Sequence, residues 1–315
     1  MLAPNATAAE VAAAINNHSA RIQTYQAPDA SISLAESVGL PLVQANIAVE
    51  RPMRFRMRGV TALTGPEIDL GSNEERFWVW ARRNEPPTVF TARHDAWASS
   101  PARASLPIEP LLVVEALGLT TVDPAAIATG PVPRGDGSLE LSVSRPDGGR
   151  RVLLVDPSTA QVREQHAYGV TGDLVASVYA DRFRYDPTIG ASTPGRVRIV
   201  APTADLDLTI NTGAVVLNGP IAGGAQLWSV PTIPGSPHVD LTGPASLAGR
   251  SWAETGPTPV DPTYASASRA AVPAPPNPNP TGGSALRTLQ QAPSTHPGFV
   301  GLPAGGRALP KQGWR

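Results

Sequence analysis

The stretch QANIAVERPMRFRMR, from Gln44 to Arg58, carries the strongest structural signal in the chain. Its even-numbered positions are mainly polar, and its odd-numbered positions are apolar with one exception. Since successive side chains of a strand point to opposite faces, this period of two predicts one strand over residues 43–58 with one apolar face. The odd-numbered set is Ala45, Ile47, Val49, Arg51, Met53, Phe55 and Met57.

Arg51 is the exception on the predicted apolar face. A guanidinium buried without a partner costs several kcal/mol, so it must find acceptors or water. In one interpretation it is a rim residue whose charge reaches past the edge of the sheet. In the other it latches a lid, or meets a polar ligand head, at the mouth of a cavity.

Three runs of residues carry a resemblance to a known family: VERPMRFR at 49–56, LGSN at 70–73 and FWVW at 77–80. They resemble the periplasmic lipoprotein carrier (LolA/LolB-like) superfamily of the outer-membrane lipoprotein-sorting type. There, a strand with Arg-Pro and an aromatic four residues after the Arg precedes an S-[DN]-G-x-x-x-[WF] strand. The resemblance covers roughly residues 8–217. It departs at Glu74, where the family has Gly, and after Trp80.

The resemblance implies a non-enzymatic carrier or binder of lipids or lipoprotein acyl chains in the periplasm or cell envelope, with a lipid or an acylated protein as its partner. Arg51 and Phe55 match family positions implicated in lid contacts and ligand transfer. The rest of the expected ligand-binding set lies on the same face, where the two Met side chains adapt to irregular acyl shapes. The alternative is that this face is plain core. These further residues are Ile47, Val49, Met53 and Met57.

The pattern along the chain predicts two helices and a long series of strands. A capping box at Thr7 and Glu10 starts a helix over residues 8–25. A second helix is expected over 106–117, with Pro110 near its start and Gly118 after its end. Alternating segments predict strands at 30–36, 43–58, 67–70, 76–82, 88–93, 138–144, 150–156, 162–168, 174–185, 196–201 and 206–217.

These elements predict an α+β fold that is mainly β: a strongly curved antiparallel sheet, or incomplete β-barrel, wrapped on an N-terminal helix and a helical insert. Such a sheet has a concave face, which either is filled with side chains or leaves a cavity for an apolar ligand. The run FWVW at 77–80 places large side chains on both faces of one strand. It is expected to be covered on both sides, or else to serve as a stacking platform for a ligand.

The last part of the chain has a different composition. Residues 245–315 are rich in Pro, Gly and Ala, as in AVPAPPNPNPTGG at 271–283, without apolar periodicity. We therefore expect a folded domain over 1–244 and a disordered tail over 245–315. The tail suggests an alternative function, an envelope interaction or sensor module of the same fold that docks a partner through it. Deletion of 256–315 separates the two functions.

Composition and motifs exclude several other classes of function. A net charge of −1 does not fit a nucleic-acid binder, and 0 Cys excludes disulfides and thiolate chemistry. No apolar run approaches the ~18 residues of a membrane span, and no signal peptide is visible; the resemblance implies that an export signal was removed or lies upstream. The five His lack metal-ligand spacing, and His94-Asp95 has no activated Ser motif beside it. We expect no catalytic residue, metal or cofactor.

Overall fold

The computed structural model describes residues 2–3, 5–34, 42–106, 109–204 and 206–243 of the 315-residue chain. All of them belong to one unit, Met1–Pro259. The boundary expected between residues 244 and 245, and the tail expected over 245–315, lie outside the described residues.

Helix α1, Ala8–Ala20, begins with the capping box that the sequence predicts. The Thr7 backbone N–H donates to Glu10 Oε2 at 2.7 Å, and the Glu10 N–H donates to Thr7 Oγ1 at 3.3 Å. The expected end at residue 25 is wrong, because the helix ends at Ala20 and strand β1, Thr24–Leu34, has already begun at residue 24. The strand expected over 30–36 therefore starts six residues too late, and its residues 35 and 36 lie outside the described residues. Thr and Tyr at positions 24 and 25 favour a strand, and pairing with β2 satisfies their backbone groups.

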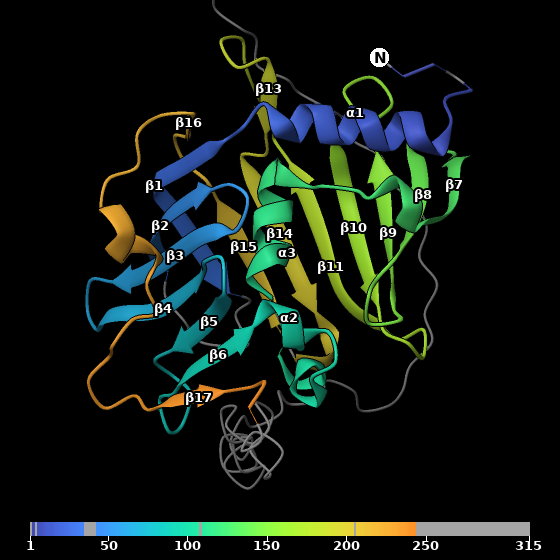
Figure 1. The fold of residues 1–315 in the computed structure, drawn as a ribbon. Coiled ribbons are helices and arrows are strands. Elements are labelled where there is room, and N and C mark those ends of the chain that lie inside the picture. Colours follow the sequence, from blue (N-terminus) through green and yellow to red (C-terminus); the bar gives the residue numbers. More distant parts are fainter. Residues whose placement is uncertain (1, 4, 35–41, 107–108, 205, 244–315) are drawn as a thin grey trace, which may run out of the picture. The chain divides into compact units, whose positions relative to one another are not determined.

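Fifteen strands of the described residues form one sheet, in the order β17-β6-β5-β4-β3-β2-β1-β15-β14-β11-β10-β9-β8-β7, with β16 paired to β1 (Figure 1). All pairs are antiparallel except β17 with β6. The first half of the sheet comprises β1 together with β2 Val43–Glu50, β3 Arg54–Thr61, β4 Gly65–Ser72, β5 Arg76–Ala81 and β6 Val89–Arg93.

The second half of the sheet runs from residue 127 to residue 217. Its strands are β7 Ile127–Pro133, β8 Leu139–Ser144, β9 Arg150–Val155, β10 Val162–Tyr168, β11 Leu174–Asp181, β14 Arg196–Ala201, β15 Leu206–Asn211 and β16 Val216–Leu217. A separate small sheet pairs β12, Arg184–Asp186, with β13, Ala191–Thr193. The short 3-10 helix η5, Pro202–Ala204, joins β14 to β15.

Two expected strands are each divided in the structure. The strand expected over 174–185 is β11 and β12, which belong to different sheets, because Arg182 between them adopts a left-handed φ of 55°. The strand expected over 206–217 is β15 and β16, with Gly213 between them at φ 63°. A backbone turn of this kind cannot continue a ladder, and the sequence pattern alone does not show it.

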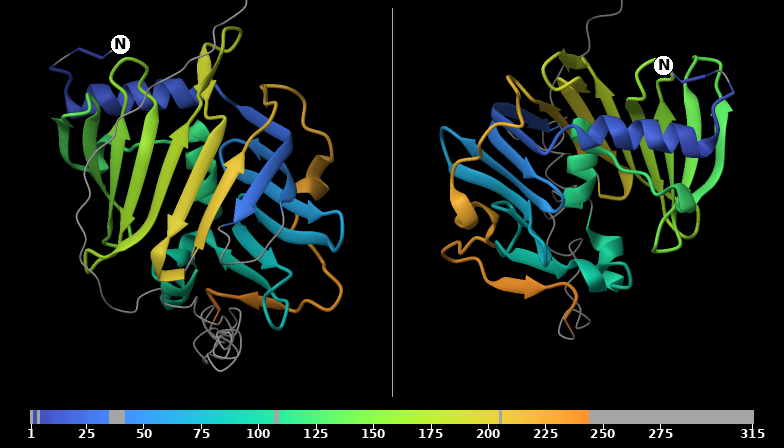
Figure 2. Two further views of the ribbon diagram at one scale, coloured as in Figure 1. Left: turned by 180° about the vertical axis from the view of Figure 1, so that it is seen from behind. Right: turned by 45° about the horizontal axis from the view of Figure 1, so that its top comes forward.

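The helical insert follows β6. It comprises α2 His94–Trp97, η2 Pro101–Ser105, α3 Pro110–Val114, the π-turn η3 Glu115–Leu119 and η4 Pro124–Ala126. Of the single helix expected over 106–117, residues 107 and 108 lie outside the described residues. In the rest, Pro110 starts α3 as expected, the helix is irregular from Glu115 onward, and Gly118 departs from helical geometry at φ 94°. In Figures 1 and 2, α3 lies between β2–β6 on one side and β11, β14 and β15 on the other.

The buried apolar residues form two large clusters. The main cluster combines the inner face of β1–β6 with the insert and with β11, β14 and β15. The second cluster lies beneath α1, where Val11 and Ile15 pack on Leu141 and Leu153 of β8 and β9. The expected class, a mainly β fold with a large antiparallel sheet, an N-terminal helix and a short helical insert, is confirmed.

The outer face of β2–β6 is covered by residues 219–240, which we name the outer strap. It contains η6, Gly224–Trp228, and ends in β17, His238–Asp240. Leu227 and Trp228 of η6 pack on Ala48 of β2. Further along, Val230 and Ile233 pack on the aromatic side chains of β5.

Candidate ligand-binding site

The single strand expected over residues 43–58 is wrong, since β2 and β3 form a hairpin whose turn is Arg51, Pro52 and Met53. Proline has no N–H to donate to a ladder, which suits Pro52 to the turn. The pairing joins Val49 to Phe55. Odd-numbered residues of β2 thus pair with odd-numbered residues of β3. The odd-numbered side chains of both strands therefore lie on one face of the hairpin, as predicted.

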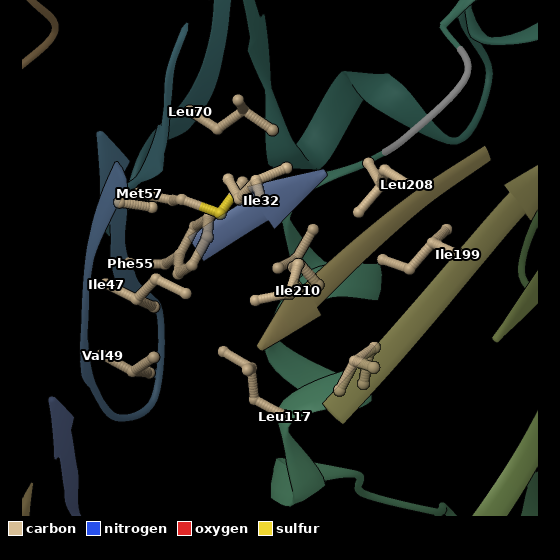
Figure 3. Packing of buried hydrophobic residues seen from close by; sticks show 14 of the residues in the cluster. Ile32, Ile47, Val49, Phe55, Met57, Leu70, Leu117, Ile199, Leu208 and Ile210 are labelled. Carbon is tan, nitrogen blue, oxygen red and sulfur yellow. The ribbon is translucent and has the colours of Figure 1, made fainter. Parts of the chain in front are cut away.

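Four of the six expected site residues lie together on the inner face of this hairpin. Their exposed fractions are 0% for Ile47, 2% for Val49, 1% for Phe55 and 2% for Met57. Figure 3 shows Phe55 and Met57 directed toward the side chains of β15 across the cluster, among them Ile210. Met53 lies in the turn, half-buried and apart from this cluster.

The helical insert covers this inner face. Val113, Ala116 and Leu117 belong to the same cluster and are at most 5% exposed. In this conformation Ile47, Val49, Phe55 and Met57 therefore contact other side chains and do not line an open cavity. A shallow pocket with room for about one water molecule lies elsewhere, beside α1. It is lined by Ile15, His18, Gly118, Thr120, Ala160, Gln161, Val162, Phe183 and Ser192.

Arg51 lies outside the apolar face, because the turn removes it from the strand. Its Nη1 donates to the carbonyl oxygen of Ser19 at 3.0 Å and to the hydroxyl of Ser19 at 2.7 Å. Burial lowers the pKa of the Arg51 guanidinium. The Arg51 backbone N–H also donates to Gln23 O at 3.0 Å. The residue thus joins the β2–β3 turn to the last turn of α1.

A polar seam borders the main cluster on the side of the second cluster. Glu115 of the insert pairs with Arg151 of β9 at 2.5 Å and accepts from Gln165 Nε2 at 3.0 Å. At the other end of the insert, Arg103 pairs with Glu109 at 2.8 Å and with Asp147 of the β8–β9 turn. The partners Glu115 and Arg151, and likewise Arg103 and Asp147, are far apart in the sequence, so no local pattern predicted these two ion pairs.

The run FWVW at 77–80 is buried on both faces, which confirms the expectation that it is covered on both sides. Phe77 and Val79 join the main cluster, whereas Trp78 and Trp80 face the outer strap. Sequence reasoning missed the buried ion pair beside Trp78. In that pair, Arg56 Nη2 donates to Asp69 Oδ2 at 2.6 Å, while Nη1 donates to the strap carbonyls of Leu227 and Ser229, each at 2.9 Å.

The serine hydroxyls beside His94 and His166 are both buried: Ser72 Oγ lies 3.2 Å from His94 Nε2, and Ser72 is 7% exposed. His94 Nε2 lies 2.9 Å from Asn73 O, and Asp95 pairs with Arg93 instead of with His94. The structure adds a group that the sequence did not suggest: His166 lies 2.9 Å from Ser177 Oγ and 3.3 Å from Glu164. Ser177 is only 3% exposed, so its hydroxyl is closed to a substrate.

Two further properties concern the described residues alone. No group of three or more His, Cys, Asp or Glu side chains in the described part of the chain is placed to hold a metal ion. Within the same ranges, no helix has the length and apolar character needed to cross a membrane.

No protein-family model and no curated protein sequence matches the chain. Among solved structures, the chain is similar to a domain assigned to outer membrane lipoprotein sorting from Vibrio parahaemolyticus, with 8% identity, a TM-score of 0.50, and coverage of 70% of this chain and 97% of that chain. It is also similar to a DUF1329 family protein from Desulfovibrio piger, with 13% identity, a TM-score of 0.48, and coverage of 70% and 95%. A third is a LolA superfamily protein from Nitrosomonas europaea, with 9% identity, a TM-score of 0.43, and coverage of 69% and 97%.

The likeness to the Vibrio domain concerns the fold. It extends over nearly all of that domain, and this chain therefore has the LolA-like fold. The resemblance found in the sequence is confirmed at that level. The ligand and the roles of the site residues need a separate argument, because one fold can serve many functions.

Proposed function

We propose that this chain is a non-enzymatic carrier or binder of lipids or lipoprotein acyl chains in the cell envelope. The observation that supports this most directly is the main apolar cluster, in which a helical insert closes the inner face of a LolA-like sheet. Transfer of a methylene group from water to such a face contributes about 0.8 kcal/mol. An acyl chain can therefore be held reversibly without covalent chemistry.

The contacts of the insert indicate where a ligand enters. The insert is joined to β9 and to the β8–β9 turn by the ion pairs of Glu115 and Arg103. Its contacts with the inner face of β2–β5 within the cluster are apolar, and a polar contact joins the two at the end of β4, where His94 Nε2 lies 3.2 Å from Ser72 Oγ and 2.9 Å from Asn73 O. Apolar contacts can be exchanged for contacts with an acyl chain, whereas separating a part-buried ion pair leaves charges unpaired. The ligand thus enters between the insert and β2–β5.

The expected site residues divide into two roles in this proposal. Ile47, Val49, Phe55 and Met57 form the wall that contacts the acyl chain once the insert moves. Arg51 holds the last turn of α1 over the end of this wall through Ser19. Met53, beside Arg51 in the turn, lies at the rim and contacts the ligand during entry.

Binding of parinaric acid, a fluorescent fatty acid, to the full-length chain tests the proposal. We expect saturable binding at one site. Phe55→Ala should weaken it at least about fivefold, because the ring of Phe55 contributes to the acyl-binding wall. The matched control is Val60→Ala on the same strand, since Val60 is 44% exposed and outside the main cluster.

Two results would overturn the proposal. The first is a folded wild-type chain that takes up no fatty acid. The second is a folded Phe55→Ala variant that binds as tightly as the Val60→Ala control. The first result would favour the interaction module that docks a partner through residues 245–315. Capture of a partner that depends on residues 256–315 would then be the measurement to make.

A further inference from the structure

Tyr25 of β1 carries a buried hydroxyl group that the fold does not use. The residue is 0% exposed and belongs to the main apolar cluster. Its Oη has no hydrogen-bond partner among the described residues. A buried polar atom without a partner typically costs about 1–3 kcal/mol, so it requires an explanation.

The surroundings of Tyr25 keep this hydroxyl available as a donor. Burial raises the pKa of Tyr25 well above its ordinary value, although Thr212 and Arg184 oppose the shift. The phenol therefore keeps its proton at neutral pH. Thr212 lies beside the Tyr25 hydroxyl, and its side chain acts on the Tyr25 pKa as a weak hydrogen-bond partner. Its Oγ1 donates to the carbonyls of Pro194 and Gly195, at 3.2 and 3.4 Å, and Tyr25 Oη forms no hydrogen bond of regular geometry among the described residues.

The sheet register places Tyr25 at one end of the proposed acyl-binding wall. Tyr25 pairs with Val49, and Val49 pairs with Phe55, so the three residues form one row across β1, β2 and β3. Neighbouring strands lie about 4.8 Å apart, which makes the row about 10 Å long. Arg51, which holds α1, follows Val49 by two residues. The Tyr25 backbone thus lies in the same row as the wall, and its hydroxyl lies beside Thr212, the residue that follows β15.

We propose that Tyr25 Oη donates a hydrogen bond to the carbonyl oxygen of an acyl ester whose hydrocarbon chain extends along Val49 and Phe55. This inference rests on the proposed function and adds to it a defined polar contact. An unbranched hydrocarbon would leave the hydroxyl unsatisfied, whereas an ester supplies the missing acceptor. The site therefore distinguishes acylated molecules from other apolar molecules of equal length.

Trp97 of α2 offers a matched control. Its Nε1 is also without a partner among the described residues, and the side chain is 6% exposed. It packs edge-on against Phe77 at 5.1 Å between ring centroids. Phe77 lies on β5, four strands from β1 and so about 19 Å away along the row. Trp97→Phe removes an equivalent orphan donor at the other end of the cluster.

The test measures displacement of parinaric acid from the full-length chain by methyl hexadecanoate and by hexadecyl methyl ether, which has a similar length without the carbonyl. We expect Tyr25→Phe to weaken ester binding by about three- to tenfold, the range of one neutral hydrogen bond, and to leave ether binding unchanged. Trp97→Phe should change neither the affinity for the ester nor the affinity for the ether. Empty Tyr25→Phe should melt at the wild-type temperature or above it, since it loses an unsatisfied group.

Three results would overturn the assignment while fatty-acid binding by the wild type persists. These are an unchanged ester-to-ether ratio in Tyr25→Phe, a loss of ester preference in Trp97→Phe instead, or a lower melting temperature of empty Tyr25→Phe. The last would mean that the hydroxyl is bonded within the empty protein. If the wild type binds neither parinaric acid nor the ester, the proposed function itself fails together with this inference.

Discussion

Arg51 contacts the carbonyl and the hydroxyl of a single residue, Ser19, and by this contact holds the end of α1 to the β2–β3 turn. Hydrogen bonds from a charged donor are about twice as strong as neutral ones. Ser19 is 1% exposed, so water does not readily replace the guanidinium. Opening of the sheet at this end, as the proposed function requires, must therefore break both hydrogen bonds between Arg51 and Ser19.

Arg51→Leu should free the last turn of α1 while the fold remains. We expect a loss of stability of about 1–3 kcal/mol, faster amide exchange in residues 19–23, and altered release of bound parinaric acid. The control is Arg58→Leu, because Arg58 is exposed on the same hairpin. Hydrogen exchange read by mass spectrometry measures the effect. Equal exchange and equal ligand release in the two variants would refute this role.

Asp156 gives stability a defined pH dependence. Desolvation would raise the pKa of its carboxyl, but hydrogen bonds from Ser158 and the charge of Arg163 outweigh it and lower the pKa below the ordinary 3.8. A carboxyl whose pKa is lowered in the folded state stabilises the protein above its unfolded pKa. This contribution is lost as the pH falls through the folded pKa, below about pH 4.

Asp156→Asn should therefore reduce stability at pH 7 and weaken its dependence on pH in the acid range. Urea denaturation at several pH values between 3 and 7 measures both effects. The control is the exposed Asp29→Asn. A variant whose stability falls with acid as steeply as that of the wild type would show that the carboxylate of Asp156 does not stabilise the fold.

At the scale of elements, the β4–β5 pair depends on a glycine. Gly71 of β4 pairs with Trp78 of β5, and the indole of Trp78 lies over the glycine. A Cβ built at Gly71 would lie 2.1 Å from a ring carbon of Trp78. The space above Gly71 thus lets Trp78 donate to Asp69 at 3.0 Å and stay beneath the outer strap.

Gly71→Ala should displace Trp78 and lower stability by about 1–3 kcal/mol, as overpacking of a core does. Gly135→Ala is the control, because nothing lies within 4 Å of a Cβ there and its φ is ordinary, so it should be neutral or slightly stabilising. Thermal unfolding and tryptophan fluorescence of the two variants measure the difference. Equal stability of the two variants would contradict the packing described for Trp78.

The hairpin β2–β3 shows how far the sequence pattern reaches at this scale. The alternation predicted the apolar face correctly, because a three-residue turn keeps odd positions opposite odd positions. It did not reveal the turn, because Arg51 and Met53 continue the alternation through it. Arg56 is one of the polar even-numbered positions of the same stretch, and it is buried because the outer strap, more than 170 residues further along the chain, covers it.

For the whole molecule, local patterns predicted the class of fold and most strands of the sheet. Strand β7 was missed because its sequence, IATGPVP, is rich in Gly and Pro, and β17 because it has only three residues. The polar seam of Glu115 and Arg151 depends on long-range packing. Whether the concave face is open or filled was undecided, and the structure shows four of its six expected site residues in one packed cluster with the insert.

At the scale of the whole molecule, the proposed function requires that the sheet and its insert pack against each other when the protein is empty and enclose an acyl chain when it is bound. The second apolar cluster, beneath α1, keeps β8 and β9 in place. The ion pairs of Glu115 and Arg103 keep the insert with that half of the sheet. The main cluster, by contrast, can exchange side-chain contacts for contacts with a ligand.

Native mass spectrometry of the full-length chain, purified without detergent, tests this central claim most directly. We predict one acyl-bearing molecule per chain, or one fatty acid per chain after incubation with parinaric acid, and a clear loss of this species in Phe55→Ala. A folded wild-type chain that stays empty under both conditions would contradict the claim, and would mean that the inner face of the sheet serves only as a core.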